Sequence, residues 1–495
     1  MAIKTQTETF RGFGITGELT SQTAVECRFG GEVETVLSAH ASVALTGAEA
    51  DNGEVRYFGK AYFSVVYEDV EKRVCRAEKG VEFTARAQDE SVYPALTPRV
   101  KLTVENVAVR REGAGVYLTA LVGADITLYG EQSFEYLSGG DLICKREPVT
   151  VLCAHLCGGG TEAEDEFETE FIGDILMHAE TAAVTEVVCE TGILRAEGEI
   201  NLSILALKGE NSLVSFERLV PFRAEIPCDS ASVGNGAEVS VSVGRTVLHA
   251  DTDEEKGKCK ITAEISLSVE GCVYEEVAVD GVTDAFSPDC AVSLTYGEAV
   301  SRGAGALARS TERVSGKAAL SAPVDFSDTF QAVTLQRAEA NVVNGENGKR
   351  LEGVAMATLL VLGADGSHRG IEISLPFSVP VQAEEGCRVS VLACGTSARQ
   401  RQEGEVDAEV TLKICLQETQ KGSVRLVSSA EEGAPIARSD SAISVYIPRA
   451  GDGLWELSKS LGKAPEEVEA SNPDMEFPIK EGQRVVIYRK KSLQS

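Results

Sequence analysis

Apolar and polar side chains alternate along most of this chain with a period of two residues. Ala61, Phe63 and Val65 are each separated by one residue, and Ile200 and Leu202 follow the same spacing. Successive side chains of a β-strand point to opposite faces of a sheet, so this spacing places the apolar groups on one face. The pattern predicts half-buried β-strands through most of the sequence.

Three of these alternating segments align with one another without gaps, at residues 55–66, 194–205 and 349–360. Each contains a glycine, and the spacing around that glycine is the same in all three. The shared positions are Gly59, Gly198 and Gly353, the phenylalanines 24 residues later (Phe83, Phe222 and Phe377) and the alanines 15 residues earlier (Ala44, Ala183 and Ala338). This spacing indicates three copies of one β-unit, in which the glycines begin equivalent strands and the phenylalanines are buried.

Polar turns rich in glycine separate the predicted strands. Residues 50–53 and 344–348 contain Asn and Gly, which tolerate positive φ and are typical of hairpin loops. Many short strands joined by such turns imply a sandwich or a barrel. We therefore predict a mainly β fold, with three tandem β-sandwich or barrel-like repeat modules followed by a small C-terminal domain.

A length of 495 residues agrees with several domains. The three predicted modules span residues 1–157, 164–285 and 300–427, and the boundary between the second and the third stays open. Residues 158–165 and 428–441 are predicted linkers, because both are polar and poor in large apolar side chains. The first linker leads into a run of carboxylates that is more typical of a solvated spacer than of a carboxylate site: Glu162, Glu164, Asp165, Glu166, Glu168 and Glu170.

The C-terminal segment has a different pattern, which predicts strand, helix, helix and strand in that order. Residues 443–447 and 485–488 read as the strands, and Pro465 suits the first position of the second helix. Gly462 stands where the C-terminus of the first helix favours glycine. One face of the first helix is formed at helical spacing by Leu454, Leu457, Ser458 and Leu461.

This order, together with the segment RAGDGLWELS at 449–458, resembles the LysM family and predicts a small βααβ LysM domain at residues 442–490. The resemblance implies a shallow groove, formed by loops 451–455 and 472–479, that binds glycans containing N-acetylglucosamine. The residues it assigns to ligand or partner binding are Gly451, Asp452, Gly453, Leu454, Asn472, Pro473 and Ile479. The family usually has Thr where this chain has Gly453, so a hydroxyl at the groove edge is missing.

Two residues near the groove have structural as well as functional interpretations. Trp455, the single tryptophan, could stack on a sugar, but packing with Leu454 and Leu457 is the favoured interpretation. Asp452 could contact a ligand, but capping of the following helix is favoured.

No catalytic residue, metal site or cofactor is predicted. Cys153, His155 and Cys157 have metal-ligand side chains, but they lack the spaced second pair that characterises zinc sites, so we interpret them as free thiols near a strand end. His40, His178, His249 and His368 stand apart from any nucleophile motif, and no phosphate-binding loop occurs. The chain is therefore predicted not to be an enzyme.

Charge and cysteine content indicate the compartment and the partners. The formal net charge is -30, while basic and acidic side chains nearly balance in residues 451–495, so the body of the chain would repel nucleic acid and anionic membranes. No stretch has the length of an apolar membrane span or of a signal-peptide core. The 13 cysteines lack a disulfide pattern. We expect a cytoplasmic protein without membrane insertion or nucleic-acid binding.

Tandem β-modules followed by one C-terminal LysM resemble the SPOCS-domain proteins of spore-forming clostridia, including the spore coat morphogenetic proteins that carry LysM. The resemblance implies a scaffold in the mother cell, at the forespore surface, that binds the ATPase of the coat's basement layer or another coat protein. The alternative is a cell-wall or cortex protein that binds peptidoglycan through N-acetylglucosamine. A weaker alternative is an enzyme with an unrecognised catalytic unit.

Overall fold

The structure is a computed structural model, and it confirms the prediction of a mainly β protein. Its two helices, both short, are the only ones among the residues that it describes, and neither is long and apolar enough to cross a membrane. Residues 346–347 of a predicted turn, and residues 442, 489 and 490 of the predicted LysM domain, lie outside the described residues. The described residues are 3–170, 173–209, 211–253, 255–345, 348–383, 386–402, 404–437 and 443–488.

The first six strands form two antiparallel sheets, which together we call unit 1. One sheet has the strand order β1-β6-β5 and the other β2-β3-β4. Their inner faces pack on one another through buried side chains such as Phe63, Val65 and Leu118. The strands are β1 (Thr5–Phe29), β2 (Val33–Asp51), β3 (Glu54–Asp69), β4 (Val74–Gln88), β5 (Thr97–Glu112) and β6 (Gly115–Gly140).

Units 2 and 3 have a similar, sandwich-like arrangement of two sheets. Unit 2 has the sheets β11-β12-β7 and β10-β9-β8, and unit 3 has β13-β19-β18 and β14-β17-β16-β15. The strands of unit 2 are β7 (Ile143–Glu170), β8 (Ile175–Glu190), β9 (Ile193–Lys208), β10 (Ser212–Pro227), β11 (Gly236–Asp253) and β12 (Lys258–Phe286). Those of unit 3 are β13 (Cys290–Lys317), β14 (Ala319–Leu320), β15 (Thr329–Gly345), β16 (Gly348–Leu362), β17 (His368–Pro380), β18 (Arg388–Gln402) and β19 (Glu405–Pro435).

The repeated glycine and phenylalanine face each other across adjacent strands in all three units. The paired residues are Gly59 and Phe83, Gly198 and Phe222, and Gly353 and Phe377. A Cβ added to any of these glycines would lie 2.4 to 2.6 Å from the end of the phenylalanine ring. The ring thus occupies the space that a side chain on the facing strand would take. This pairing explains the constant spacing of 24 residues, because each hairpin has the same length between the two positions.

The predicted linker at residues 158–165 and the first part of the one at residues 428–441 are wrong, because they lie in strands, whereas residues 438–441 lie outside the described residues. Residues 158–165 belong to β7, and residues 428–435 belong to β19. The chain passes instead from unit 1 to unit 2 at residues 141–142 and from unit 2 to unit 3 at residues 287–289. The sheets therefore group residues 5–140, 143–286 and 290–435, which moves the predicted boundaries at 157, 164, 285 and 300.

The carboxylate run lies in β7 rather than in a spacer, and all its members except Asp165, which is half-buried and pairs with Arg218 at 3.0 Å, are on the outward face. Its acidic side chains alternate with inward ones, such as Ala163, which is buried. Glu168 pairs with Lys258 at 2.6 Å and Glu166 pairs with Lys260 at 2.9 Å, both across the ladder to β12. These pairs are exposed and contribute little to stability, but they favour this register over one shifted by a single residue.

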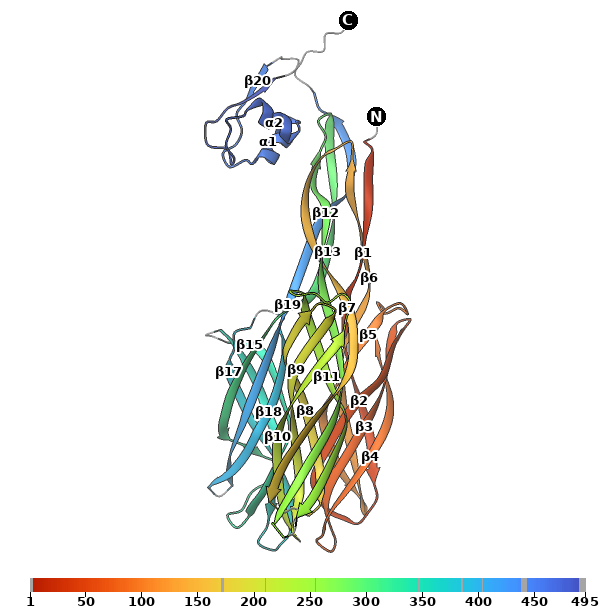
Figure 1. Ribbon diagram of the computed structural model, residues 1–495, viewed down its shortest axis with the longest axis vertical. Coiled ribbons are helices and arrows are strands. Elements are labelled where there is room, and N and C mark those ends of the chain that lie inside the picture. Colours follow the sequence, from red (N-terminus) through yellow and green to blue (C-terminus); the bar gives the residue numbers. More distant parts are fainter. Residues whose placement is uncertain are drawn as a thin grey trace.

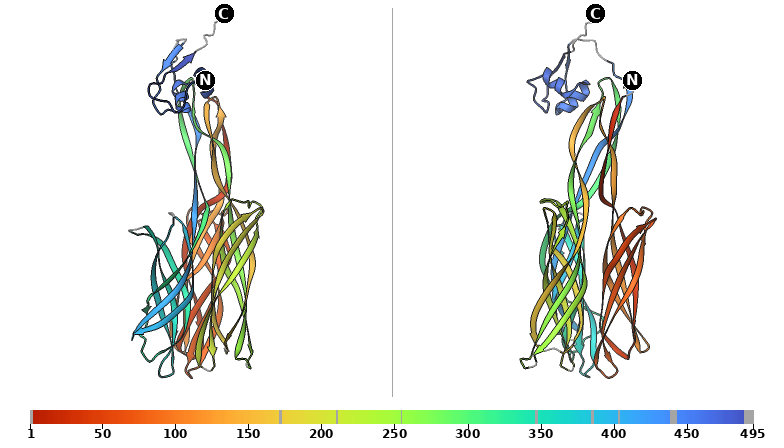
Figure 2. Two further views of the ribbon diagram at one scale, coloured as in Figure 1. Left: turned by 60° about the vertical axis from the view of Figure 1, so that its left-hand side comes forward. Right: turned by 45° about the vertical axis from the view of Figure 1, so that its right-hand side comes forward.

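Six long strands continue beyond the sandwich-like units into a stalk (Figure 1). In the described ladders, β6 beyond Tyr129 pairs with β1 alone, β12 beyond Tyr274 with β7 alone, and β19 beyond Gln417 with β13 alone. Each unit therefore contributes one two-stranded ribbon, and the ribbons run side by side in every view (Figure 2). Side chains from all three ribbons share the stalk core, including Tyr136, Val279 and Leu426.

The three units also meet at a buried hydrogen-bonded junction. Glu68 of unit 1 accepts hydrogen bonds from the backbone N–H of His368 (2.9 Å) and from its Nδ1 (2.8 Å) in unit 3. The other ring nitrogen of His368 lies 3.0 Å from the carbonyl oxygen of Asn211 in unit 2. Both side chains of the pair are almost fully buried, so the junction holds the relative placement of the units.

Replacing Phe222 or Phe377 with Ala should destabilise the affected unit by about 3–5 kcal/mol, since both rings are buried and their loss leaves a cavity. Denaturant unfolding followed by circular dichroism measures this loss. Val233 is 82% exposed, so V233A is the control and should change the unfolding free energy by less than about 0.5 kcal/mol. A loss below about 1 kcal/mol for both phenylalanine variants would contradict their place in the core.

Candidate binding site

The C-terminal domain has the predicted order of strand, helix, helix and strand. Its elements are β20 (Ile443–Tyr446), α1 (Leu454–Leu461), α2 (Pro465–Ser471) and β21 (Val485–Tyr488), and the two strands pair antiparallel. Leu457 and Ser458 on the predicted face of α1 are buried, and Leu454 and Leu461 pack against the same core. The core of the domain consists of Leu457, Val468, Ile479 and Val485.

Local sequence signals set the ends of the two helices. Gly462 adopts the left-handed conformation with φ 60°, as predicted for the C-terminus of α1. Gly453 precedes α1 and has no side chain to cap it, and its backbone N–H donates to the Glu456 carboxylate at 3.0 Å. Pro465 opens α2 and Asn472 ends it.

The structure brings the two loops of the predicted groove together through their backbones. Gly451 donates a backbone hydrogen bond to the carbonyl of Ile479 (2.9 Å), and Ile479 donates one to the carbonyl of Asp452 (2.9 Å). Gly451 is exposed, whereas Ile479 is buried. The backbone N–H groups of Gly451 and Ile479 are therefore used within the domain.

The other predicted binding residues divide into structural and exposed ones. Asn472 donates to the carbonyls of Val468 (3.0 Å) and Val486 (3.1 Å) and accepts from the N–H of Val486 (2.9 Å), so it joins α2 to β21. Leu454 packs against the core, and Pro473 is exposed.

The predicted helix cap at Asp452 is wrong. Its carboxylate accepts a hydrogen bond from the backbone N–H of Arg449 at 3.1 Å, and Gly453 is the residue that precedes α1 as its N-cap. Asp452 therefore stabilises the turn before the helix, because a carboxylate accepts readily from a nearby backbone N–H in such turns. Its side chain is held in this local contact.

The prediction that Trp455 packs in the domain core is wrong. Its side chain packs instead against the tip of the stalk. Its ring lies edge-on to Phe286 with a centroid distance of 5.3 Å, and its Nε1 donates to Asp284 at 2.8 Å. Lys459, one turn further along α1, lies 2.7 Å from both oxygens of the same carboxylate. These contacts anchor the domain at the far end of the stalk from the sandwich-like units (Figure 1).

Asp284 is charged in this contact at neutral pH. Burial disfavours the charged carboxylate, but the hydrogen bonds from Lys459 and Trp455 outweigh burial and lower the pKa of Asp284 below its usual value. The pKa of Asp284 is lower in the docked state than in the undocked one, so its charge stabilises docking at any pH above the undocked pKa. This stabilisation is lost as the pH falls through the lowered pKa of the docked state.

An apolar stripe lies on β20 and the residue that follows it. Ile443, Val445 and Ile447 are 59%, 60% and 68% exposed, although alternate positions of a strand next to a core usually bury one face. β20 pairs with β21 on one side in the described ladders. Exposed apolar side chains gathered at alternate positions of one short segment are typical of contact surfaces.

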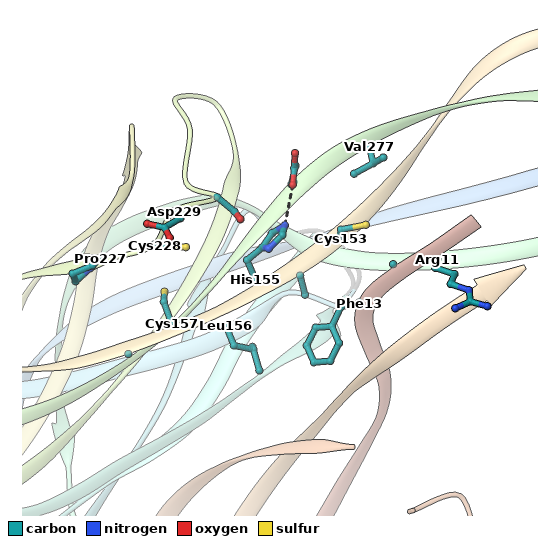
Figure 3. Close-up of a pocket in the computed structure, with 15 residues that line it drawn as sticks. Arg11, Phe13, Cys153, His155, Leu156, Cys157, Pro227, Cys228, Asp229 and Val277 are labelled. Carbon is teal, nitrogen blue, oxygen red and sulfur yellow. Dashed lines mark hydrogen bonds and ion pairs between the residues drawn. The ribbon is translucent and has the colours of Figure 1, made fainter. Parts of the chain in front are cut away.

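A second candidate region lies at the base of the stalk, where Cys153, His155 and Cys157 line a cavity of about 840 Å³ (Figure 3). His155 Nε2 lies 2.9 Å from the Glu275 carboxylate. All the cysteines are free, and in the described part of the chain no group of three or more His, Cys, Asp or Glu side chains could hold a metal ion.

Histidine–carboxylate contacts within and between the units are what the sequence interpretation missed. Besides the junction at His368, His178 Nδ1 lies 2.7 Å from Glu180. Burial disfavours the charged imidazole, but the bond to Glu180 outweighs it and raises the pKa of His178, whereas burial lowers the pKa of the nearby His40 in unit 1. No short motif could have found the contact between Glu68 and His368, because 300 residues separate them.

Comparison of the chain with protein-family models, with curated proteins and with solved structures gave no match.

The substitution D284N should release the C-terminal domain from the stalk tip at neutral pH, because a neutral amide loses the ion pair with Lys459. Trp455 is the single tryptophan, so its fluorescence emission should shift to longer wavelength as the ring becomes hydrated. The control is D280N on the same strand, whose exposed side chain pairs with Arg146, and its emission should stay unchanged. Equal emission of D284N and the unchanged protein would contradict the anchor.

Acid should produce the same shift in the unchanged protein as the pH falls through the lowered pKa of Asp284. A fluorescence titration from neutral pH downwards measures it, with far-UV circular dichroism to separate undocking from unfolding. D284N should lack this step. A step of equal size in D284N would assign it to another group.

Cys153 and Cys157 should be free thiols in the reduced protein and should hold no metal. Elemental analysis of untreated protein should find zinc well below one equivalent, and thiol titration under denaturing conditions should count all 13 cysteines. Stoichiometric zinc that disappears in C157S would overturn this interpretation.

Proposed function

We propose that this chain is a non-enzymatic scaffold or adaptor of the spore envelope. It acts in the mother-cell cytoplasm at the forespore surface, and its C-terminal domain docks onto a protein of the coat's basement layer. The expected partner is the ATPase that lays down this layer. The partner and the compartment rest on the resemblance of the sequence pattern to SPOCS-domain proteins that end in LysM.

The hydrogen bonding within the predicted groove is the observation that favours docking on a protein over the binding of a sugar. The N–H groups of Gly451, Gly453 and Ile479 all bond within the domain, and the Asn472 side chain is held by β21. Sugar sites depend on a few well-placed polar groups that remain free for the ligand. The loops offer few such groups here, and position 453 adds no hydroxyl.

The placement and the surface of the domain add to this argument. It sits at the end of the stalk, beyond the three units, where a large partner can approach it (Figure 2). The exposed stripe of Ile443, Val445 and Ile447 supplies apolar area of the kind that protein interfaces bury. Charge nearly balances in this segment, whereas the net charge of the chain is -30, so an acidic partner is repelled least at this end.

The alternative function is the binding of peptidoglycan glycans through the same loops. The favouring observation is the order of elements, which resembles a family that binds N-acetylglucosamine. Gly451 and Pro473 remain exposed beside the groove and leave room for a sugar contact.

A tagged full-length chain should recover the basement-layer ATPase from sporulating cells as the main specific protein, identified by mass spectrometry. The double substitution I443K/V445K should abolish this recovery, because it charges the apolar stripe without removing a buried side chain. V233K is the matched control on an exposed valine of unit 2 and should retain recovery. Recovery of muropeptides alone would defeat the scaffold function.

The substitution G453T should raise the affinity for N-acetylglucosamine oligomers, measured by calorimetric titration of the full chain. Gly453 has φ -82°, which any residue adopts, and the new side chain would meet the flexible end of Glu456 at 2.6 Å, so Thr can be accommodated. The unchanged chain should bind these oligomers more weakly than its protein partner. Saturable micromolar sugar binding by the unchanged chain, without a retained protein, would favour the glycan-binding function.

A further inference from the structure

The cavity at the base of the stalk is lined by more than one thiol. Cys157 comes from β7, in one sheet of unit 2, and Cys228 directly follows β10, in the other sheet. Figure 3 shows both sulfur atoms at the same end of the cavity. Cys228 belongs to the core cluster of unit 2, and Cys157 packs against the same cluster.

The backbone holds Cys228 in place beside Cys157. Its N–H donates to the carbonyl of Gly192 at 3.0 Å, and its carbonyl accepts from the N–H of Ala231 at 2.9 Å. On the other side, Cys157 stands opposite Gly271 in the ladder with β12, and a Cβ there would lie 3.0 Å from the Cys157 sulfur. The missing side chain leaves room for the sulfur.

The other cysteines nearby are directed elsewhere. The sulfur of Cys153 faces β1, where a Cβ on Gly12 would lie 2.8 Å from it. Cys272 is almost fully buried beside the Tyr274 hydroxyl, and Cys189 is buried outside the lining of the cavity. Cys157 and Cys228 are thus the pair that shares both proximity and access from the cavity.

We propose that Cys157 and Cys228 form a redox pair, which hydrogen peroxide converts into a disulfide that joins the two sheets of unit 2. This site is independent of the docking function proposed above. The cavity admits an oxidant as small as peroxide without any rearrangement of the strands.

The reaction balances in two steps. Cys228, as thiolate, attacks one peroxide oxygen, the O–O bond breaks, and the products are a sulfenic acid and hydroxide, which takes up the proton that Cys228 lost. The sulfur of Cys157 then attacks the sulfenic sulfur, the S–S bond forms, and hydroxide leaves with the proton of Cys157 as water. Two thiols and one peroxide give one disulfide and two waters, and two electrons pass from sulfur to oxygen.

The surroundings of Cys157 suit it to the second step, the attack on the sulfenic sulfur of Cys228. Burial and the neighbouring Cys228 thiol raise the pKa of Cys157 to about 12, so it stays protonated at neutral pH. A protonated thiol is a poor nucleophile towards peroxide, so Cys157 does not take the first step. In the second step its proton passes to the hydroxide that leaves the sulfenic sulfur, and Cys157 attacks as this proton is lost.

The disulfide would restrain unit 2 where it enters the stalk. It would close a long loop of chain that contains all of β8, β9 and β10, and such a loop has a large entropy to lose in the unfolded state. The oxidised protein should therefore unfold several degrees above the reduced one, and dithiothreitol should reverse the shift.

The test treats the reduced full chain with hydrogen peroxide, blocks the remaining thiols by alkylation and maps disulfide peptides by mass spectrometry. The expected result is one intramolecular linkage between Cys157 and Cys228. It should be lost in C157S and in C228S, while C415S, which removes a buried cysteine of unit 3, should retain it.

Any other result overturns the pair. Examples are a linkage through Cys153, Cys189 or Cys272, a linkage between chains, or no linkage at a peroxide concentration that fully oxidises glutathione. A serine variant that fails to fold is recognised by circular dichroism. In that case the proposal is tested on the unchanged protein alone, by the disulfide-linked peptide and by the reversible shift in its unfolding temperature.

Discussion

The burial of ribbon faces in the stalk is the constraint on which the rest of the structure depends. A two-stranded ribbon has too little area to bury its apolar face alone. Here each unit supplies one ribbon, and side chains such as Tyr136, Val279 and Leu426 cover one another in the centre. The three units are thereby held side by side, and Asp284 near the end of one ribbon is presented to Trp455 and the C-terminal domain.

Much of the fold could be predicted from local sequence. The period of two gave the strands, and the spacing of Gly198 and Phe222 reflected a cross-strand pair in hairpins of equal length. The predicted linkers were wrong because glycines and charged side chains, which are typical of linkers, also occur within β7 and β19. Around Ala163 and Phe167 the inward positions keep the period of a strand, so that signal was present and was outweighed by composition.

The candidate site was predictable only in part, and the reasons are physical. Helix spacing identified the face of α1 that carries Leu457, because core packing follows local periodicity. The role of Trp455 depends on Phe286 and Asp284, which lie far away in sequence, and no pattern within the domain contains them. The same holds for Glu68 and His368, whose meeting requires the placement of two complete units.

The path of the chain also has a consequence for biosynthesis. The ribbons form in the order of translation, and the third closes only when β19, the last long strand, has left the ribosome. Until then the faces of the first two ribbons lack the cover of Val424 and Leu426, and a nascent chain with such exposed strands is a target for chaperones and proteases. Cellular quality control would therefore remove interrupted products before the C-terminal domain is displayed.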